Sequence, residues 1–162
     1  GKVAATPDEA THYMNNLDFP GAVEEIKQTS QYFKQKYNVD KAFVCGFCMG
    51  GALSIASAVR TTEFAAAAPF YGIPPLALAD PKKANCPIMG FFGERDNHAG
   101  FSDPAAAKKL DQALTEGGVE HEIIIYDNVD HAFMNADRPQ VYNAEVAKKA
   151  LAAMIQFFNK HL

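Results

Sequence analysis

Short apolar runs that alternate with helix-like segments are the feature that most constrains the fold of this 162-residue chain. The runs have strand length and consist of residues 41–46, 65–71, 87–92 and 121–126. Segments with helical spacing stand around them: residues 20–37, 49–59 and 104–116, and a last helix that opens at Pro139. Strands that are apolar along their length and alternate with helices are typical of parallel sheets. We therefore expect the α/β class, a mostly parallel sheet with helices on both faces.

Capping residues support two of these helices. Asp18 can cap a helix that has Pro20 in its first turn, and Asp103 can do the same before Pro104. We expect residues 1–17 to be irregular. Ligand sites in parallel α/β folds lie beyond the carboxyl ends of the strands, so the loops that follow the apolar runs are candidate sites.

The composition fits one globular domain. Hydrophobic residues make up 48% of the chain and charged residues 21%, which excludes a disordered chain, a fibre and a coiled coil. The 15 basic and 19 acidic residues give a net charge of −4. We therefore expect no binding of nucleic acid through a basic surface.

No segment predicts a signal peptide or a membrane span. The longest apolar stretch, residues 65–79, is short and is interrupted by Pro69, Pro74 and Pro75. The three cysteines are odd in number and cannot form a complete set of disulfides. These features predict a protein of the reducing cytoplasm that does not bind membranes.

The turn after the first run has the pattern Gly-x-Cys-x-Gly, in which Gly46 and Gly50 flank Cys48. This is the nucleophile elbow of α/β-hydrolases, with Cys in place of Ser. We expect Cβ atoms at both glycines to collide across the turn, and Gly51 to let helix and strand pack closely. At a helix N-terminus Cys48 is favoured as a thiolate, and the N–H of Met49 faces a developing oxyanion.

Other interpretations of these cysteines stay open. Cys48 could be an inert residue in a Gly-rich turn. Cys45 and Cys48 also form a C-x-x-C pattern, which is typical of thioredoxin-like redox pairs and of half a zinc site. Cys45 lies inside the predicted strand and Cys48 after it, so the two thiols should not face each other. No Gly-Lys-Ser/Thr follows the turn, which argues against a phosphate loop, and Cys86 is expected in the core.

A cysteine nucleophile needs a base and a group that orients the base. Asp96 follows the third run and His131 the fourth, and α/β-hydrolases carry nucleophile, acid and base in this order. His98 lies at the same edge and competes with His131 as the base, and Asp130 is an alternative acid. A turn-forming Asp96 and a solvated His131 are the non-catalytic alternatives.

Several motifs resemble the dienelactone hydrolase family of α/β-hydrolases. They are residues 46–51, 70–72, 93–96 and 130–133, and the opening residues 1–20, so the resemblance covers nearly the whole chain. It implies that Cys48 is the nucleophile, Asp96 the orienting acid and His131 the base. It also implies hydrolysis of a small ester or lactone through a thioester acyl-enzyme, with no metal and no organic cofactor.

The chain departs from the family pattern after the base. The best-known family members carry an Arg four residues after the base, where it helps to hold a substrate carboxylate. Asn135 occupies that place here, and Arg138 is nearby without matching it. The resemblance therefore implies an ester or lactone rather than the dienelactone itself, with Phe47, Tyr71 and Asn135 beside the substrate.

A second departure lies at the start of the chain. Family members carry further strands before the point that corresponds to Gly1, including one whose loop supplies a second oxyanion donor. We therefore expect residues 1–162 to form one α/β-hydrolase domain that lacks these N-terminal strands. The alternative function is a non-catalytic remnant or split half that associates with a missing segment. We expect either a monomer or weak self-association through an open edge on the strand at residues 41–46.

Overall fold

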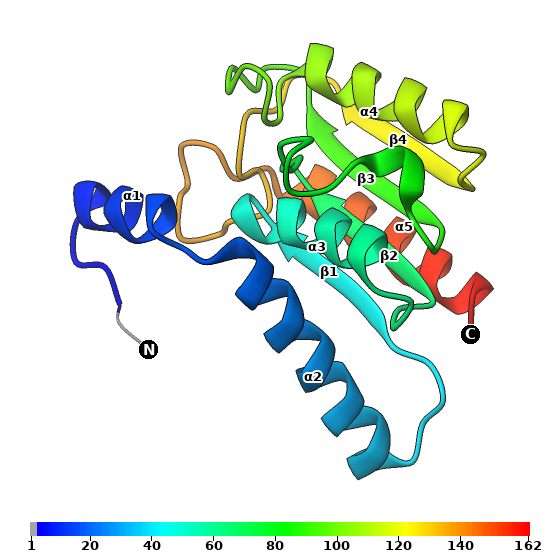
Figure 1. Ribbon diagram of the computed structural model, residues 1–162. Helices are drawn as coiled ribbons and strands as arrows, with labels where there is room; N and C mark the ends of the chain where they lie inside the picture. The colour runs from blue at the N-terminus through cyan, green and yellow to red at the C-terminus, as the bar shows by residue number, and fades with distance from the viewer. Residues whose placement is uncertain (1–2) are drawn as a thin grey trace.

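A four-stranded, wholly parallel sheet forms the centre of the computed structural model, which describes residues 3–162 (Figure 1). The strands are β1 (Phe43–Phe47), β2 (Ala66–Phe70), β3 (Ile88–Gly93) and β4 (His121–Tyr126), and they lie in this order across the sheet. Each strand agrees with a predicted apolar run to within two residues at either end. The prediction of a parallel α/β fold is confirmed.

Five helices surround the sheet in the described part of the chain. They are α1 (Pro7–Asn15), α2 (Phe19–Tyr37), α3 (Met49–Arg60), α4 (Pro104–Glu116) and α5 (Ala144–Lys160), with a short 3₁₀ turn η1 (Pro81–Lys83). The Asp18 side chain accepts a hydrogen bond from the N–H of Gly21, and that of Asp103 from the N–H of Ala105. Both predicted caps are confirmed.

The expectation of an irregular start is wrong from Pro7 onward, because α1 begins there; Gly1 and Lys2 lie outside the described residues. The Thr6 hydroxyl accepts a hydrogen bond from the N–H of Glu9, and the Glu9 carboxylate accepts one from the N–H of Ala5 at 2.7 Å. This reciprocal capping follows from the Thr-x-x-Glu pattern, which is a helix start signal in the sequence.

The last helix begins at Ala144 rather than at Pro139. The Asn143 side chain accepts a hydrogen bond from the N–H of Val146 at 3.1 Å and caps α5. The residues just before it form tight turns, in which the N–H groups of Val141 and Tyr142 donate to the carbonyl of Arg138. Asn is a favoured N-cap residue, so the helix starts after Asn143 rather than at Pro139.

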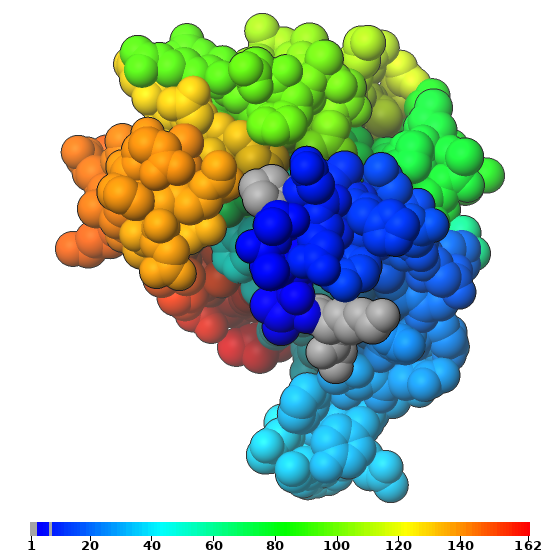
Figure 2. Space-filling model, turned by 90° about the vertical axis from the view of Figure 1, so that its left-hand side faces the viewer, coloured from blue at the N-terminus to red at the C-terminus, as the bar shows by residue number. Residues whose placement is uncertain are grey.

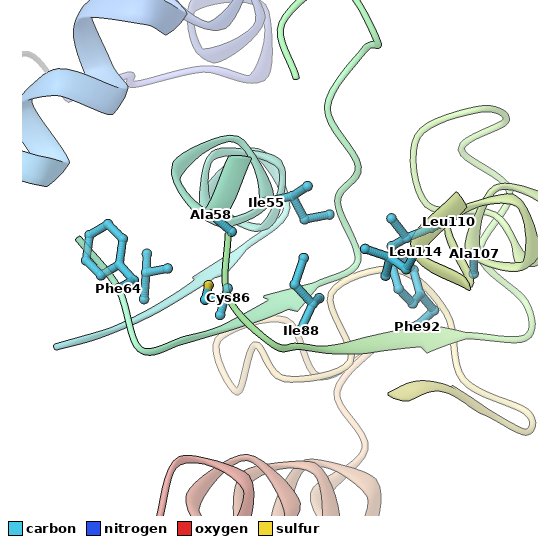
Figure 3. Close-up of a cluster of buried hydrophobic side chains, with 11 residues drawn as sticks. Ile55, Ala58, Phe64, Cys86, Ile88, Phe92, Ala107, Leu110 and Leu114 are labelled. Carbon is cyan, nitrogen blue, oxygen red and sulfur yellow. The ribbon is translucent and has the colours of Figure 1, made fainter. Parts of the chain in front are cut away.

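Helices cover both faces of the sheet, as predicted. The core between the sheet and α3 and α4 contains Ile55, Ile88, Phe92, Leu110 and Leu114 (Figure 3). The core on the α5 face contains Phe70, Phe91, Phe133, Ala150 and Phe157. Neighbouring side chains of a strand point to opposite faces, so each strand contributes to both cores. Cys86 is buried, as expected.

β1 lies at the edge of the sheet. Phe43 to Phe47 pair in parallel register with β2, and no other strand within residues 3–162 pairs with β1. The apolar run at residues 41–46 predicts a buried strand, but Cys45 and Phe47 are exposed, so that expectation is wrong. The expected open outer edge is present. Within the same residues, none of the helices has both the length and the apolar composition to cross a membrane.

Candidate active site

Cys48 lies in the turn between β1 and α3 with φ 55° and ψ −120°, a conformation that residues other than Gly rarely adopt. A Cβ at Gly46 would lie 2.2 Å from the carbonyl oxygen of Gly50, so only Gly fits there. A Cβ at Gly50 would meet nothing within 4 Å, so the expected collision at that residue is wrong. A Cβ at Gly51 would lie 2.5 Å from the carbonyl oxygen of Phe70, which agrees with close packing of α3 on β2.

Cys48 and His131 line the same pocket, and the His131 ring interacts with the Cys48 thiol. This interaction and the N–H of Met49 keep the pKa of Cys48 below its ordinary value, although burial acts in the opposite direction. Burial by itself would lower the pKa of His131, but hydrogen bonds with Asp96 and Cys48 outweigh it and raise the pKa to about 9. These shifts favour a thiolate beside an imidazolium at neutral pH.

Asp96 follows β3 and contacts the other side of the His131 ring. Its Oδ2 lies 2.7 Å from Nδ1 of His131, and its side chain has no exposed surface. Burial raises the pKa of Asp96, but hydrogen bonds from His131, His98 and Ser102 outweigh it and lower the pKa to about 2. An ionised carboxylate can only accept, so His131 carries a proton on Nδ1 and turns its other nitrogen toward Cys48.

A second histidine contacts the same carboxylate. The ring Nδ1 of His98 lies 2.8 Å from Oδ1 of Asp96, and its backbone N–H donates to the same oxygen at 3.0 Å. The centroids of the two imidazole rings are 4.3 Å apart. Both histidines that competed as the base therefore meet at Asp96, and His131 is the one that lines the pocket with Cys48.

One group of side chains within residues 3–162 has the ligand types and the spacing for a metal ion, namely Asp96, His98 and His131. Their ligand atoms all lie within 4.8 Å of one another. The two short hydrogen bonds on Asp96 already account for this closeness. We therefore describe the cluster as a hydrogen-bond network.

All three thiols are free in the structure, so no disulfide joins Cys45 and Cys48. Cys48 lines the pocket at the end of β1, whereas Cys45 lines a separate groove beside α2. Burial raises the pKa of Cys86 to about 11 and that of Cys45 as well, and only the pKa of Cys48 is lowered. Cys48 is thus the one thiol suited to act as a nucleophile.

A pocket of about 400 Å³ opens above the thiol and is lined by Phe47, Cys48, Tyr71, His131, Ala132, Met134, Asn135 and Arg138. The residues that sequence reasoning placed beside the substrate, Phe47, Tyr71 and Asn135, all lie in it. Tyr71 has φ 38°, and its ring stands edge-on to His131 at 4.9 Å. Figure 2 looks onto this side of the molecule, where α1 and the segment after β4 lie side by side.

Two residues of the site, Arg138 and Ser102, were not assigned to it from the sequence. Arg138 lines the pocket, and no carboxylate within residues 3–162 forms an ion pair with it. The family Arg lies four residues after the base, whereas Arg138 lies seven residues after His131, so Arg138 does not match the family pattern. Ser102 is fully buried, and its hydroxyl lies 3.2 Å from Nδ1 of His131. Its position beside a helix cap carries no signal of this contact.

The fold and the site together define a class. A parallel sheet covered on both faces, a thiol on a strained turn after β1, a buried carboxylate after β3 and a histidine after β4 are typical of the α/β-hydrolase fold. The family model described as "Dienelactone hydrolase family" matches residues 1–162. The chain belongs to this family and is a hydrolase of the dienelactone hydrolase type.

Relatives and solved structures agree with this assignment. "Protein usf" of Aquifex pyrophilus is 29% identical over 169 residues, which cover 100% of this chain and 71% of the relative. The "Putative carboxymethylenebutenolidase" of Aquifex aeolicus is 27% identical over 173 residues, with the same coverage. A solved structure called "Putative Dienelactone Hydrolase", from Klebsiella pneumoniae, superposes with a TM-score of 0.81 at 23% identity. The match covers 97% of this chain and 68% of that one, and shows the shared fold.

Proposed function

We propose that the chain hydrolyses a small ester or lactone with Cys48 as nucleophile, His131 as base and Asp96 as orienting acid. The observation that carries this proposal is the placement of Cys48 and His131 in one open pocket, with the Asp96 carboxylate 2.7 Å from Nδ1 of His131. The name carboxymethylenebutenolidase, given to a relative, supports a lactone or ester as the substrate class.

In the first half of the proposed reaction, the Cys48 thiolate attacks the ester carbonyl and a C–S bond forms. The N–H of Met49, at the N-terminus of α3, stabilises the oxyanion. The C–O bond then breaks, and the His131 imidazolium gives its proton to the leaving oxygen. In a lactone that oxygen stays attached to the acyl group, so the product is a ring-opened thioester on Cys48.

In the second half, His131 is neutral and accepts a proton from water as the water attacks the thioester. The C–S bond breaks, the carboxylic product leaves and the thiolate forms again beside the imidazolium. Asp96 stays ionised throughout because its pKa is about 2, and it keeps the Nδ1 proton of His131 in place.

The pocket lining suggests the substrate's shape. Phe47 and Tyr71 offer aromatic surface, and Asn135 offers an amide. Arg138 adds a guanidinium without a carboxylate partner among the described residues, which suits a substrate that carries its own carboxylate. We propose that Arg138 holds that group.

Hydrolysis of an activated aryl ester tests the assignment directly. We expect Cys48→Ala and His131→Ala to lose activity, since each removes a group that forms or breaks bonds in both halves of the reaction. Equal rates for Cys48→Ala and the unchanged protein would refute the nucleophile. Retained activity in His131→Ala together with loss in His98→Ala would move the base to His98.

The proposal also covers the number of domains and the location of the protein in the cell. We propose that residues 1–162 belong to one α/β-hydrolase domain, because both cores share the single sheet. The free thiols suit a reducing location, and we propose the cytoplasm. Thermal unfolding in a single cooperative step would support one domain, and two separate transitions would contradict it.

A second candidate function is association with another chain segment through β1. The unpaired edge of β1 favours it, as does an adjoining groove of about 410 Å³ whose lining includes Phe33, Tyr37 and Phe43. Light scattering over a wide concentration range tests this candidate. A constant monomer mass, with no co-purifying peptide by mass spectrometry, would count against it.

A further inference from the structure

Asp96 is shared by two imidazole rings. Its Oδ2 accepts from Nδ1 of His131, and its Oδ1 accepts two hydrogen bonds from His98, one from the ring and one from the backbone. The rings lie on different loops, one after β3 and one after β4. The mechanism proposed above uses only one of them, so the role of the His98 ring is still open.

The environments of the two rings differ in a way that separates their roles. The His131 side chain is 14% exposed and lines the pocket, whereas that of His98 is 52% exposed and is not among the lining residues. His98 meets an ionised carboxylate through Nδ1, so that nitrogen carries a hydrogen and donates it. A ring that faces solvent and donates to Asp96 is suited to holding the carboxylate.

The orientation of the Asp96 carboxylate must be fixed for its hydrogen bond with His131 to form. Only one orientation of its plane directs Oδ2 at Nδ1 of His131, at 2.7 Å. The two donors of His98 fix Oδ1, and a carboxylate held at one oxygen cannot turn the other away. Ser102 also lowers the pKa of Asp96, and the hydrogen bond recorded for its hydroxyl is to Nδ1 of His131, at 3.2 Å.

We propose that His98 is a positioning residue, whose ring N–H locks the Asp96 carboxylate in the plane that fixes the working tautomer of His131. This inference rests on the proposed function and adds a fourth member to the line Cys48–His131–Asp96. His98 touches neither substrate nor thiol in this role. Its loss should slow both halves of the reaction and leave substrate binding unchanged.

A matched pair of substitutions tests the role. His98→Leu keeps the bulk of the ring but removes the donor. His98→Asn restores a donor, because the amide nitrogen of Asn is as many bonds from Cα as Nδ1 of His. We expect kcat for the aryl ester to fall about tenfold in His98→Leu with KM unchanged, the scale of a hydrogen bond to a charged group. We expect His98→Asn to stay within about threefold of the unchanged protein in kcat.

A measurement without substrate separates this proposal from the proposed function. The hydrogen-bonded Nδ1 proton of His131 can be followed by proton NMR in the free protein. We expect its signal in the unchanged protein and in His98→Asn, and its broadening by exchange with water in His98→Leu. An unchanged signal in His98→Leu would overturn the proposal, whatever the activity of Cys48→Ala shows about the nucleophile.

Two outcomes of the activity measurements would also contradict the positioning role of His98. Equal losses of kcat in His98→Asn and His98→Leu would show that the ring acts by something other than its donor. A complete loss in both, with His131→Ala still active, would make His98 the base. Thermal unfolding of each variant identifies any that has simply lost its fold.

Discussion

Replacing Asp96 by Asn removes the charge that favours the imidazolium form of His131 while keeping the size of the side chain. The pKa of His131 is raised from 6.5 to about 9, and its bonds with Asp96 and Cys48 cause the rise against the effect of burial. A rise of about 2.5 units corresponds to about 3 kcal/mol in favour of the imidazolium. Without the charge of Asp96, we expect His131 to be mainly neutral at pH 7.

The consequence for Cys48 follows from its ordinary pKa of 9.0. Without an imidazolium beside it, only about one thiol in a hundred is ionised at pH 7. We therefore expect alkylation of Cys48 by iodoacetamide at pH 7 to fall about tenfold to hundredfold in Asp96→Asn. Ester hydrolysis should fall at least as far, because the Asn amide can also donate to Nδ1 and select the wrong tautomer of His131.

The assay is the rate of Cys48 alkylation as a function of pH, followed by mass spectrometry. Asp130→Asn is the matched control, since Asp130 neighbours His131 in sequence but Asp96 makes the bond to the ring. We expect the control to keep the pH profile of the unchanged protein. If Asp96→Asn kept its alkylation rate at pH 7 within about twofold, the proposed charge pair would be refuted.

Three further predictions concern the turn, the pH dependence and the pocket. Gly46→Ala should destabilise the protein by about 1–3 kcal/mol in urea unfolding, since its Cβ would lie 2.2 Å from a backbone oxygen. Gly50→Ala should be neutral or stabilise by about 0.5–1 kcal/mol, because it lies in α3 with open space at its Cβ; equal losses in both would contradict this contrast. Ester hydrolysis should decline as pH rises through about 9, where His131 loses the proton that it gives to the leaving oxygen, and a flat profile to higher pH would exclude that step. Arg138→Gln should raise KM about tenfold for a carboxylate-bearing ester but leave a neutral ester unaffected. Arg95→Gln is its control, because Arg95 bonds to Asn128.

Local signals predicted most of the fold. The strands were found because each is a short apolar run, and the caps of α2 and α4 were found because Asp18 and Asp103 precede a proline. The two misplaced helix starts, of α1 and α5, also concern local signals. The sequence carries a capping signal for each helix, namely Thr6 with Glu9 before α1 and Asn143 before α5. The expectations rested instead on the lack of helical periodicity in residues 1–17 and on Pro139.

The order of strands and loops along the chain was enough to predict three residues of the candidate site. Cys48, Asp96 and His131 each follow a strand, and parallel strands bring their carboxyl ends to one edge. The positions of His98, Ser102 and Arg138 within the site were not predictable. His98 and Ser102 share a loop with Asp96 and Arg138 follows His131, so chain order alone gives all of them the same general location.

The sequence by itself determined the α/β class, the parallel sheet and the strained turn at Cys48, because hydrophobic spacing and glycine placement act over a few residues. Only the tertiary structure decided which histidine lines the pocket with the thiol and that Asp96 serves two rings. Asp96 and His131 are 35 residues apart, and their 2.7 Å contact depends on the order of β3 and β4 and on the path of each loop beyond its strand. Contacts of that kind are fixed by packing across the whole sheet, which no local pattern records.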